Sequence, residues 1–210
     1  MAELNQVIDV LNHVADIIEQ NKQHLTELDG AIGDGDHGIN MSRGFSFVKK
    51  TLDEGSFETA ADLFKKCGMA LVAHVGGASG PLFGTAFLRA SMTLKDKTEV
   101  SVADYVSLLK ASIEGIKMRG KSDAGEKTML DALIPAYEAG EAAVKQDKDA
   151  QEVLQAVKDG AEKGLKETEK LVAKKGRASY VGERSLGHQD PGAASVALIL
   201  GAVADYFAEA

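Results

Sequence analysis

Residues 28–41, Leu-Asp-Gly-Ala-Ile-Gly-Asp-Gly-Asp-His-Gly-Ile-Asn-Met, separate two runs of helical periodicity with glycine and aspartate. Three further stretches of unusual composition lie at residues 75–83, 119–128 and 174–192. The periodicity elsewhere predicts eight amphipathic helices, and the first, third, fifth and seventh are each followed by one of these stretches. Because short connections favour antiparallel neighbours, we expect all four stretches to meet at one end of a helical bundle.

The predicted helices carry regular apolar stripes and are joined at the other end by ordinary polar turns. Two examples are the second helix, with Met41, Phe45, Val48 and Leu52, and the eighth, with Val196, Leu198, Ile199 and Val203. No strand-like alternation persists along the chain, and no linker divides it. We therefore predict an all-α fold, a single-domain antiparallel eight-helix barrel or bundle over residues 1–210.

The composition excludes several classes of protein. A net charge of -8 without a basic run argues against a nucleic-acid partner, because affinity for a phosphate backbone depends on clustered Lys and Arg. The lone Cys67 excludes an internal disulfide. Acidic residues interrupt the apolar N-terminal stripe, and Gly-Gly-Ala-Ser-Gly-Pro breaks the uncharged stretch 67–88. We expect a cytoplasmic protein with neither a secretory signal nor a membrane span.

Three carboxylates within eight residues, Asp29, Asp34 and Asp36, are the most informative chemical feature. The glycines between them let the backbone turn so that the side chains converge. Converging carboxylates repel one another unless a cation lies between them, and such hard oxygen ligands suit Mg²⁺ or Ca²⁺. An Asp- and Gly-rich turn without any ligand is the alternative, since both residues are common in turns.

Two better-known nucleotide motifs are only superficially present. Residues 33–38 satisfy G-x-G-x-x-G, but no strand precedes them, so they do not form a dinucleotide-binding fingerprint. Residues 120–128 approach the phosphate-binding P-loop pattern, yet Glu126 stands where Lys is required. An EF-hand register that starts at Asp34 also fails, because Phe45 occupies the position of the bidentate Glu.

Other groups in the unusual stretches suit an anionic ligand. Residues 76–84 end one helix and start the next with Pro81, and free N–H groups at a helix start bind phosphate. The sequence Asp190-Pro-Gly marks a second such start, and Arg177 is suited to clamp a phosphate. The alternatives are a tight corner between helices and a structural ion pair.

The remaining candidates are His37, for a polar contact, and Met129, for an apolar surface under a base. Either is also consistent with an ordinary structural role, a satisfied histidine or a core methionine. Phosphates would be repelled by the three carboxylates unless divalent cations lay between them. Acidic and anion-binding groups at one end of the bundle therefore predict a site for a magnesium nucleotide.

Four runs of the sequence also resemble the nucleotide-binding subunit of bacterial dihydroxyacetone kinase. They are Ile-Gly-Asp-Gly-Asp-His-Gly-Ile-Asn-Met (32–41), Gly-Gly-Ala-Ser-Gly-Pro-Leu-Phe-Gly (76–84), Lys-Thr-Met-Leu-Asp (127–131) and Gly-Arg-Ala-Ser-Tyr-Val-Gly-Glu-Arg-Ser-Leu-Gly-His-Gln-Asp-Pro-Gly (176–192). The resemblance extends over nearly the whole chain. It implies an eight-helix antiparallel barrel that binds ADP and two Mg²⁺ at one end.

The resemblance also implies roles for individual residues. The metal ligands would be Asp29, Asp34 and Asp36. The nucleotide would be bound by His37, Gly38, Ile39, Asn40, Ala78, Ser79, Gly120, Met129, Arg177, Asp190 and Pro191. It implies no catalytic residue on this chain, because the substrate-holding residues are expected on a partner subunit.

The chain ends at residue 210 without a substrate domain, so we expect the form of the kinase that depends on the phosphotransferase system. In that form ADP is a retained cofactor. A phosphotransferase-system subunit phosphorylates it, and the phosphoryl group passes to dihydroxyacetone on another subunit. Two alternatives remain open: an ADP-dependent binding module that acts on a transcriptional regulator, and a kinase subunit that exchanges ADP for ATP. We also expect residues 121–127 and 174–189 to close over the nucleotide.

Overall fold

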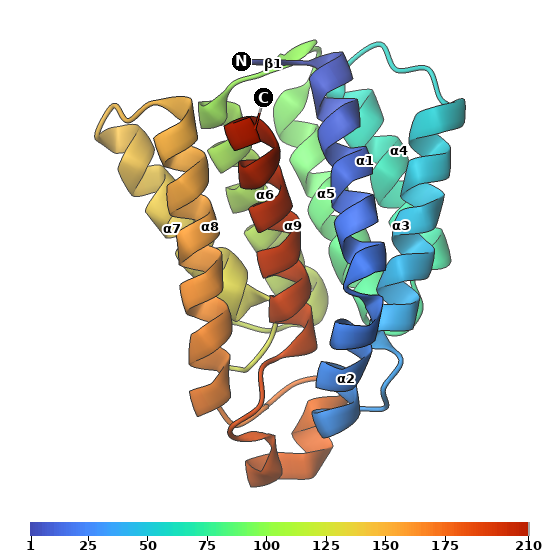
Figure 1. Cartoon of the computed structure of the whole chain (residues 1–210), viewed down its shortest axis with the longest axis vertical. Helices are drawn as coiled ribbons and strands as arrows, with labels where there is room; N and C mark the ends of the chain where they lie inside the picture. The colour runs from blue at the N-terminus through green and yellow to red at the C-terminus, as the bar shows by residue number, and fades with distance from the viewer. Residues whose placement is uncertain (210) are drawn as a thin grey trace.

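The computed structural model describes residues 1–209, most of which are helical (Figure 1). The α-helices are α1 (Leu4–Gln20), α2 (Lys22–Ile32), α3 (His37–Glu54), α4 (Ala60–His74), α5 (Ser79–Leu94), α6 (Val102–Gly120), α7 (Leu130–Lys145), α8 (Ala150–Glu167) and α9 (Pro191–Glu209). Two 3₁₀ helices, η1 (Thr168–Lys170) and η2 (Arg177–Ser185), and two short strands, β1 (Ala2–Glu3) and β2 (Glu99–Val100), complete the described elements.

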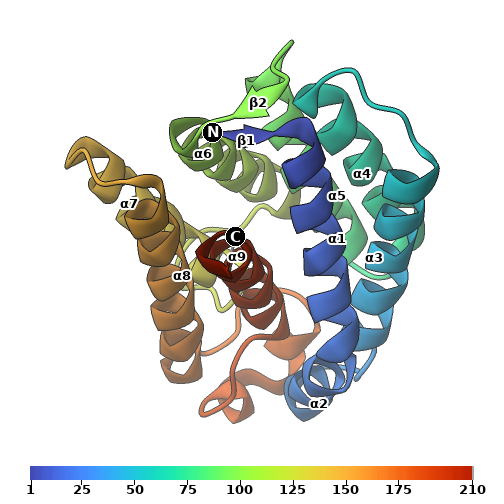
Figure 2. The ribbon, with the colours of Figure 1, turned by 45° about the horizontal axis from the view of Figure 1, so that its top comes forward.

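The long helices form a closed ring. Following the chain, α1 packs on α3, each later helix packs on the next, and α9 returns to pack on α1 (Figure 2). Neighbouring helices of the ring run in opposite directions, as the short connections favour. The predicted all-α antiparallel barrel is therefore confirmed for the described residues.

The first predicted helix is divided into α1 and α2, so the described chain has nine α-helices where eight were expected. The division falls at Asn21, whose side-chain amide donates a hydrogen bond of 2.8 Å to the Ile17 carbonyl. Asn side chains compete in this way with the backbone hydrogen bonds of a helix. The break turns α2 across one end of the barrel, where Asp29 lies on it.

The parity of the connections is as predicted. Residues 33–36, 75–78, 121–129 and 171–190 all lie at the end that carries α2, which we call the rim (Figure 1). The α3–α4, α5–α6 and α7–α8 connections lie at the opposite end. There β1 pairs with β2, Ala2 opposite Val100, a two-residue pairing too short to appear as alternation in the sequence.

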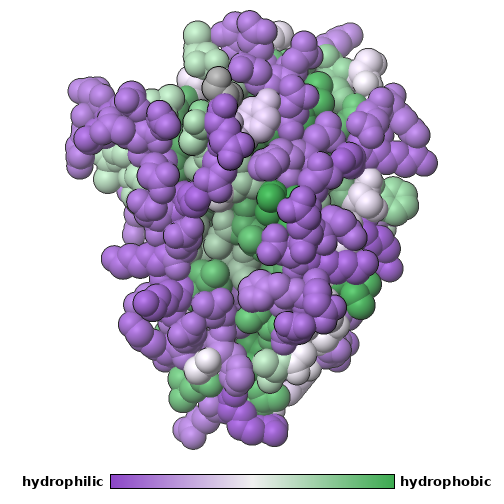
Figure 3. Space-filling model, viewed as in Figure 1, coloured by the Kyte–Doolittle hydropathy of each residue, from purple (hydrophilic) through white to green (hydrophobic). Residues whose placement is uncertain are grey.

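Helix α9 is a core helix. It is long and apolar enough to cross a membrane, but 61% of the apolar window is buried in the fold. Its hydrophobic residues show on one face between the hydrophilic side chains of its neighbours (Figure 3). The uncharged stretch 67–88 is interrupted between α4 and α5, as expected, and Cys67 is fully buried.

Glycines on α8 bring its backbone against α7. A Cβ at Gly160 would lie 2.6 Å from the Pro135 carbonyl oxygen, and one at Gly164 would lie 2.8 Å from the Cα of Ala132. Glycine in a helix interior costs roughly 0.5–1 kcal/mol relative to alanine. The close approach of the two backbones offsets that cost and fixes the start of α7 beside the end of α8.

The barrel is not completely filled by side chains. An apolar cavity of about 370 Å³ runs inside the ring. Its lining extends from Ala2 and Val100 at the end opposite the rim to Met129 at the rim end. The acidic residues do not line this cavity, so the candidate site is a separate, surface feature of the rim.

Candidate functional site

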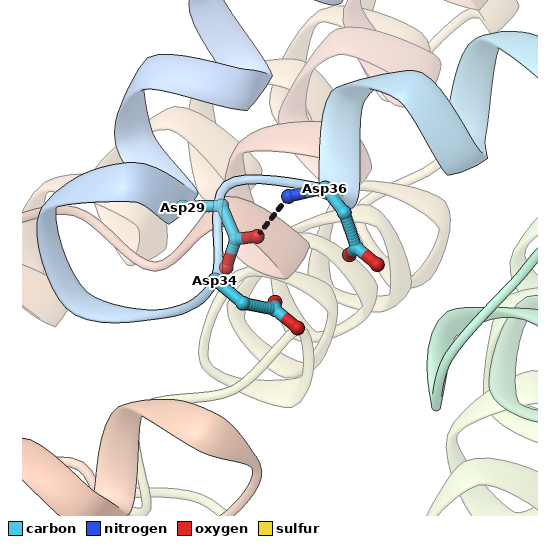
Figure 4. Close-up of side chains that lie close together, drawn as sticks. All are labelled: Asp29, Asp34 and Asp36. Carbon is cyan, nitrogen blue, oxygen red and sulfur yellow. Dashed lines mark hydrogen bonds between the residues drawn. The ribbon is translucent and has the colours of Figure 1, made fainter.

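The three predicted carboxylates converge. Asp29 comes from α2, and Asp34 and Asp36 come from the connection to α3 (Figure 4). One oxygen of each carboxylate lies within 4.8 Å of the others. Asp34 and Asp36 are exposed, whereas Asp29 is buried. The cluster has the ligand type and the access that a hard divalent cation requires.

Asp29 has a second role as the cap of α3. Its Oδ2 atom accepts hydrogen bonds from the backbone N–H groups of Asp36, at 2.9 Å, and His37, at 3.1 Å. These N–H groups lie at a helix start, where they have no partner within the helix. A Cβ at Gly33 would come within 3.0 Å of the Asp29 Cγ, so a larger residue there would displace the carboxylate.

The guanidinium group of Arg177 faces the cluster. The Arg177 Nε, at the start of η2, lies 2.6 Å from the Asp34 Oδ2. The Arg177 side chain is 69% exposed and that of Asp34 is 37% exposed, so the ion pair is accessible to water and contributes little to stability. The pair holds η2 over the acidic loop, and η2 also contacts α2.

Four helices begin at the rim, as a consequence of the antiparallel ring: α3, α5, α7 and α9. Each helix start carries a partial positive charge and N–H groups that have no partner within the helix. Three of these starts contain predicted nucleotide residues, and the fourth directly follows Met129. The predicted residues are placed as follows: His37, Gly38, Ile39 and Asn40 in the first turn of α3; Ala78 and Ser79 at the start of α5; Gly120 at the end of α6; Met129 before α7; Arg177 in η2; Asp190 and Pro191 at the start of α9.

His37 joins three of the helices through a hydrogen-bonded chain. Its Nδ1 lies 3.1 Å from the Ser79 Oγ on α5, and its Nε2 lies 2.8 Å from the Ser195 Oγ on α9. The Ser195 hydroxyl donates to the Pro191 carbonyl, so it accepts from His37 Nε2–H, and Nδ1 accepts from Ser79. Burial lowers the pKa of His37, while Asp29 and Asp36 raise it. The neutral imidazole fits this chain of donors and acceptors.

Met129 and Asp190 are less accessible than an open binding surface would require. Met129 is 5% exposed and packs beside Gly192, where a Cβ would lie 3.4 Å from the Met129 Cβ. Asp190 is 8% exposed and caps α9, since its Oδ2 accepts the Ala193 N–H at 2.7 Å. Burial raises the pKa of Asp190 to about 7. Both residues therefore lie beneath the surface of the rim and support the residues above them.

Three polar residues of the rim were not assigned a role from the sequence: Lys127, Thr168 and Ser195. All three are buried and hydrogen-bonded. Ser195 is a polar residue in an otherwise apolar helix, and Lys127 lies in the run Lys-Thr-Met-Leu-Asp, so both carried a weak signal. Thr168 carried none, because nothing in its neighbourhood distinguishes it from the polar face of α8.

Comparisons with known proteins show which family the chain belongs to. The family model described as DAK2 domain matches residues 31–205. The chain is 47% identical to the PEP-dependent dihydroxyacetone kinase 1, ADP-binding subunit DhaL, of Listeria innocua over 92% of this chain and 91% of that protein. It is 40% identical to the PEP-dependent dihydroxyacetone kinase, ADP-binding subunit DhaL, of Escherichia coli over 93% of each chain.

A solved structure shares the fold. The dihydroxyacetone kinase from C. freundii in complex with AMP-PNP and Mg²⁺ matches with a TM-score of 0.73 and 27% identity, over 95% of this chain and 33% of that one. The present chain therefore corresponds to about a third of that larger kinase. Taken with the near full-length matches, the chain belongs to the DAK2 domain family and groups with the ADP-binding subunits of dihydroxyacetone kinases.

Proposed function

We propose that this chain is the ADP-binding subunit of a dihydroxyacetone kinase that depends on the phosphotransferase system. Residues 1–210 form one nucleotide-binding domain that works in the cytoplasm. One observation carries the proposal: the acidic cluster and the starts of four helices lie at the same end of the barrel. Carboxylates and helix starts attract opposite charges, and a magnesium diphosphate satisfies both.

In this proposal Asp29, Asp34 and Asp36 hold two Mg²⁺ ions, which neutralise the phosphates when bound. The approach of the three carboxylates within 4.8 Å supports the assignment. Asp34 would then exchange its ion pair with Arg177 for a metal. Arg177 becomes free to contact a phosphate, which agrees with its exposed position on η2.

The nucleotide would contact the helix starts and the residues that flank them. The residues proposed for it are His37, Gly38, Ile39, Asn40, Ala78, Ser79, Gly120, Met129, Arg177, Asp190 and Pro191. Within this set His37 orients Ser79: the Ser79 hydroxyl donates to the His37 Nδ1, which leaves the oxygen lone pairs of Ser79 directed elsewhere.

This chain supplies positioning and charge, and we assign it no general base. Phosphoryl transfer demands little covalent chemistry of the protein, so charge neutralisation and alignment suffice on this side of the reaction. Dihydroxyacetone is held by a second subunit, and a phosphotransferase-system subunit regenerates ATP from the bound ADP. The chain alone is therefore expected not to phosphorylate free dihydroxyacetone.

Identification of the ligand in freshly purified protein tests the proposal. Acid release followed by mass spectrometry is expected to give about one ADP per chain after extensive dialysis in magnesium buffer. Reconstitution with a dihydroxyacetone-binding subunit and phosphotransferase-system proteins is expected to give dihydroxyacetone phosphate. Rapid exchange with ATP and turnover without the phosphotransferase system would instead identify an ATP-dependent kinase subunit. ADP-dependent capture of a transcriptional regulator without turnover would identify a binding module.

A further inference from the structure

Lys127 is a buried lysine at the rim. It lies in the connection between α6 and α7 and is 1% exposed. Its backbone has φ 59°, in the left-handed region that a residue with a Cβ adopts only under constraint. The side chain turns into the protein, toward the two ends of the segment that links α8 to α9.

The ammonium group of Lys127 donates three hydrogen bonds to backbone carbonyls. The distances from Nζ are 2.6 Å to the Thr168 oxygen, 3.2 Å to the Leu171 oxygen and 2.5 Å to the His188 oxygen. All three of its protons are therefore used. Burial lowers the pKa of Lys127, while the nearby carboxylates Asp190, Glu169 and Asp131 raise it. A buried cation is tolerated only with such hydrogen bonds and counter-charges.

The three carbonyls belong to the two ends of one segment. Thr168 lies just before residues 171–190, Leu171 is their first residue and His188 lies near their end, so Lys127 joins the two ends of this loop at its base. The middle of this loop, which we call its arc, contains η2, and η2 begins with Arg177. The loop is thus anchored at its base by a buried group and at its arc by the exposed ion pair of Arg177 with Asp34.

The three hydrogen bonds of Lys127 connect directly to residues proposed to bind the nucleotide. Thr168, whose carbonyl accepts from Lys127, also accepts the Asp190 N–H through its Oγ1 at 3.0 Å. Met129 lies two residues after Lys127 and packs beside Gly192. A backbone hydrogen bond, from the Lys174 N–H to the Glu126 carbonyl at 3.0 Å, joins the same two segments beside the Lys127 side chain.

We propose that Lys127 is a positioning residue for the nucleotide site, which fixes the third rim segment to both ends of the fourth and so places Met129, Arg177 and Asp190 together. The inference rests on the proposed function. Lys127 does not itself contact a phosphate, since its three protons face carbonyls inside the fold. This distinguishes it from a P-loop lysine, whose ammonium group reaches the phosphates.

The test compares Lys127→Met with two controls. Lys127→Met keeps most of the length of the side chain but removes the ammonium donor from three carbonyls; among the described residues, only the Thr168 carbonyl has another donor, the Leu171 N–H. Lys145→Met makes the same change on an exposed lysine at the opposite end of the barrel. Leu154→Ala, in the core of α8, lowers stability without touching the rim. Dissociation of ADP in magnesium buffer and the melting temperature of the ligand-free protein are measured for each variant.

Lys127→Met is expected to release ADP about tenfold to a hundredfold faster, the range usual for groups that orient binding residues. Lys145→Met and Leu154→Ala are expected to release it at the wild-type rate, although Leu154→Ala melts at a lower temperature. Unchanged release from Lys127→Met, or equal acceleration in Leu154→Ala, would overturn the inference. Wild-type protein that binds no magnesium ADP would instead overturn the proposed function.

Chemical rescue distinguishes the loss of the ammonium group from a general loss of packing, because only the former can be reversed by an added amine. In Lys127→Ala the missing ammonium group can be supplied by ethylammonium, whereas tetramethylammonium at the same ionic strength has no N–H to donate. Ethylammonium is expected to slow ADP release from Lys127→Ala toward the wild-type rate and to leave Leu154→Ala unchanged. Equal effects of the two cations on Lys127→Ala would contradict a positioning role for the hydrogen-bonding ammonium group.

Discussion

The three aspartates of the acidic loop are alike in the sequence but different in the fold. Asp34 is exposed and forms an ion pair with the exposed Arg177, whereas Asp29 is buried and caps α3. Replacement of Asp34 by Asn is expected to weaken the binding of magnesium ADP by about tenfold or more. The melting temperature of the ligand-free protein should stay at the wild-type value, since an exposed ion pair contributes little. Titration calorimetry measures the loss of binding, and thermal unfolding checks that the melting temperature is unchanged.

Asp29→Ala is the informative comparison for Asp34→Asn. It removes a metal ligand and also leaves two N–H groups of the α3 start without an acceptor. We expect a loss of about 1 kcal/mol in the free energy of unfolding without any nucleotide, as for other helix caps. Equal stability losses for the two variants would mean that the acidic loop is a structural turn.

Asp190 makes the stability of the ligand-free protein depend on pH. Its pKa is raised to about 7 in the fold, against about 3.9 for an unfolded aspartate. Between these values the folded protein holds a proton that the unfolded chain has lost, so stability falls as pH rises from about 4 to about 7. Asn at this position cannot titrate. Urea unfolding should show the difference between wild type and Asp190→Asn changing across this window, and parallel curves would contradict it.

At the scale of elements, the contact between α7 and α8 fixes the position of the start of α7 at the rim. Gly164 lies where α8 crosses the start of α7, and a methyl group there would meet the Cα of Ala132 at 2.8 Å. Gly164→Ala is expected to cost about 1–3 kcal/mol of stability, as overpacking usually does. Gly30→Ala is the matched control, because a Cβ on this exposed residue of α2 meets nothing within 4 Å. It should raise stability by roughly 0.5–1 kcal/mol. Chemical denaturation distinguishes the two, and a neutral Gly164→Ala would refute the close contact.

Nucleotide binding is expected to slow hydrogen exchange in the middle of the segment 171–190 but not at its base. Its base is held by the buried Lys127, while η2 in its arc is held over the acidic loop by exposed groups. Hydrogen exchange should be slow at Thr168–Lys170 in all states. In η2 it should be fast without ligand and markedly slower with magnesium ADP. Equal exchange of η2 in both states would exclude closure over the nucleotide.

The sequence predicted the elements and their directions, and its limits are physical. Apolar periodicity located the helices and parity placed the four connections at one end, because both depend on local spacing and short loops. The division at Asn21 was missed, since it depends on one side-chain hydrogen bond to Ile17. The family that the motifs indicated is confirmed by the comparisons. The roles of Lys127 and Ser195 were not predictable, because their partners lie 41 and 158 residues away.

At the scale of the whole molecule, the antiparallel ring gathers charges of both signs at one end. It brings four helix starts to the rim, and the break at Asn21 turns α2 so that Asp29 faces the acidic loop. A chain with net charge -8 repels a nucleotide on average, so local positive charge, from bound cations and from the helix starts, must reverse that repulsion. Magnesium and ADP are therefore expected to bind as mutually dependent ligands.

Titration calorimetry with ADP in millimolar magnesium and in excess chelator tests this dependence most directly. Magnesium is expected to strengthen ADP binding by about fivefold to 150-fold, and ADP is expected to strengthen magnesium binding by the same factor. Asp34→Asn should reduce that factor. An equal affinity for ADP with and without magnesium would contradict a metal-bridged diphosphate at the rim.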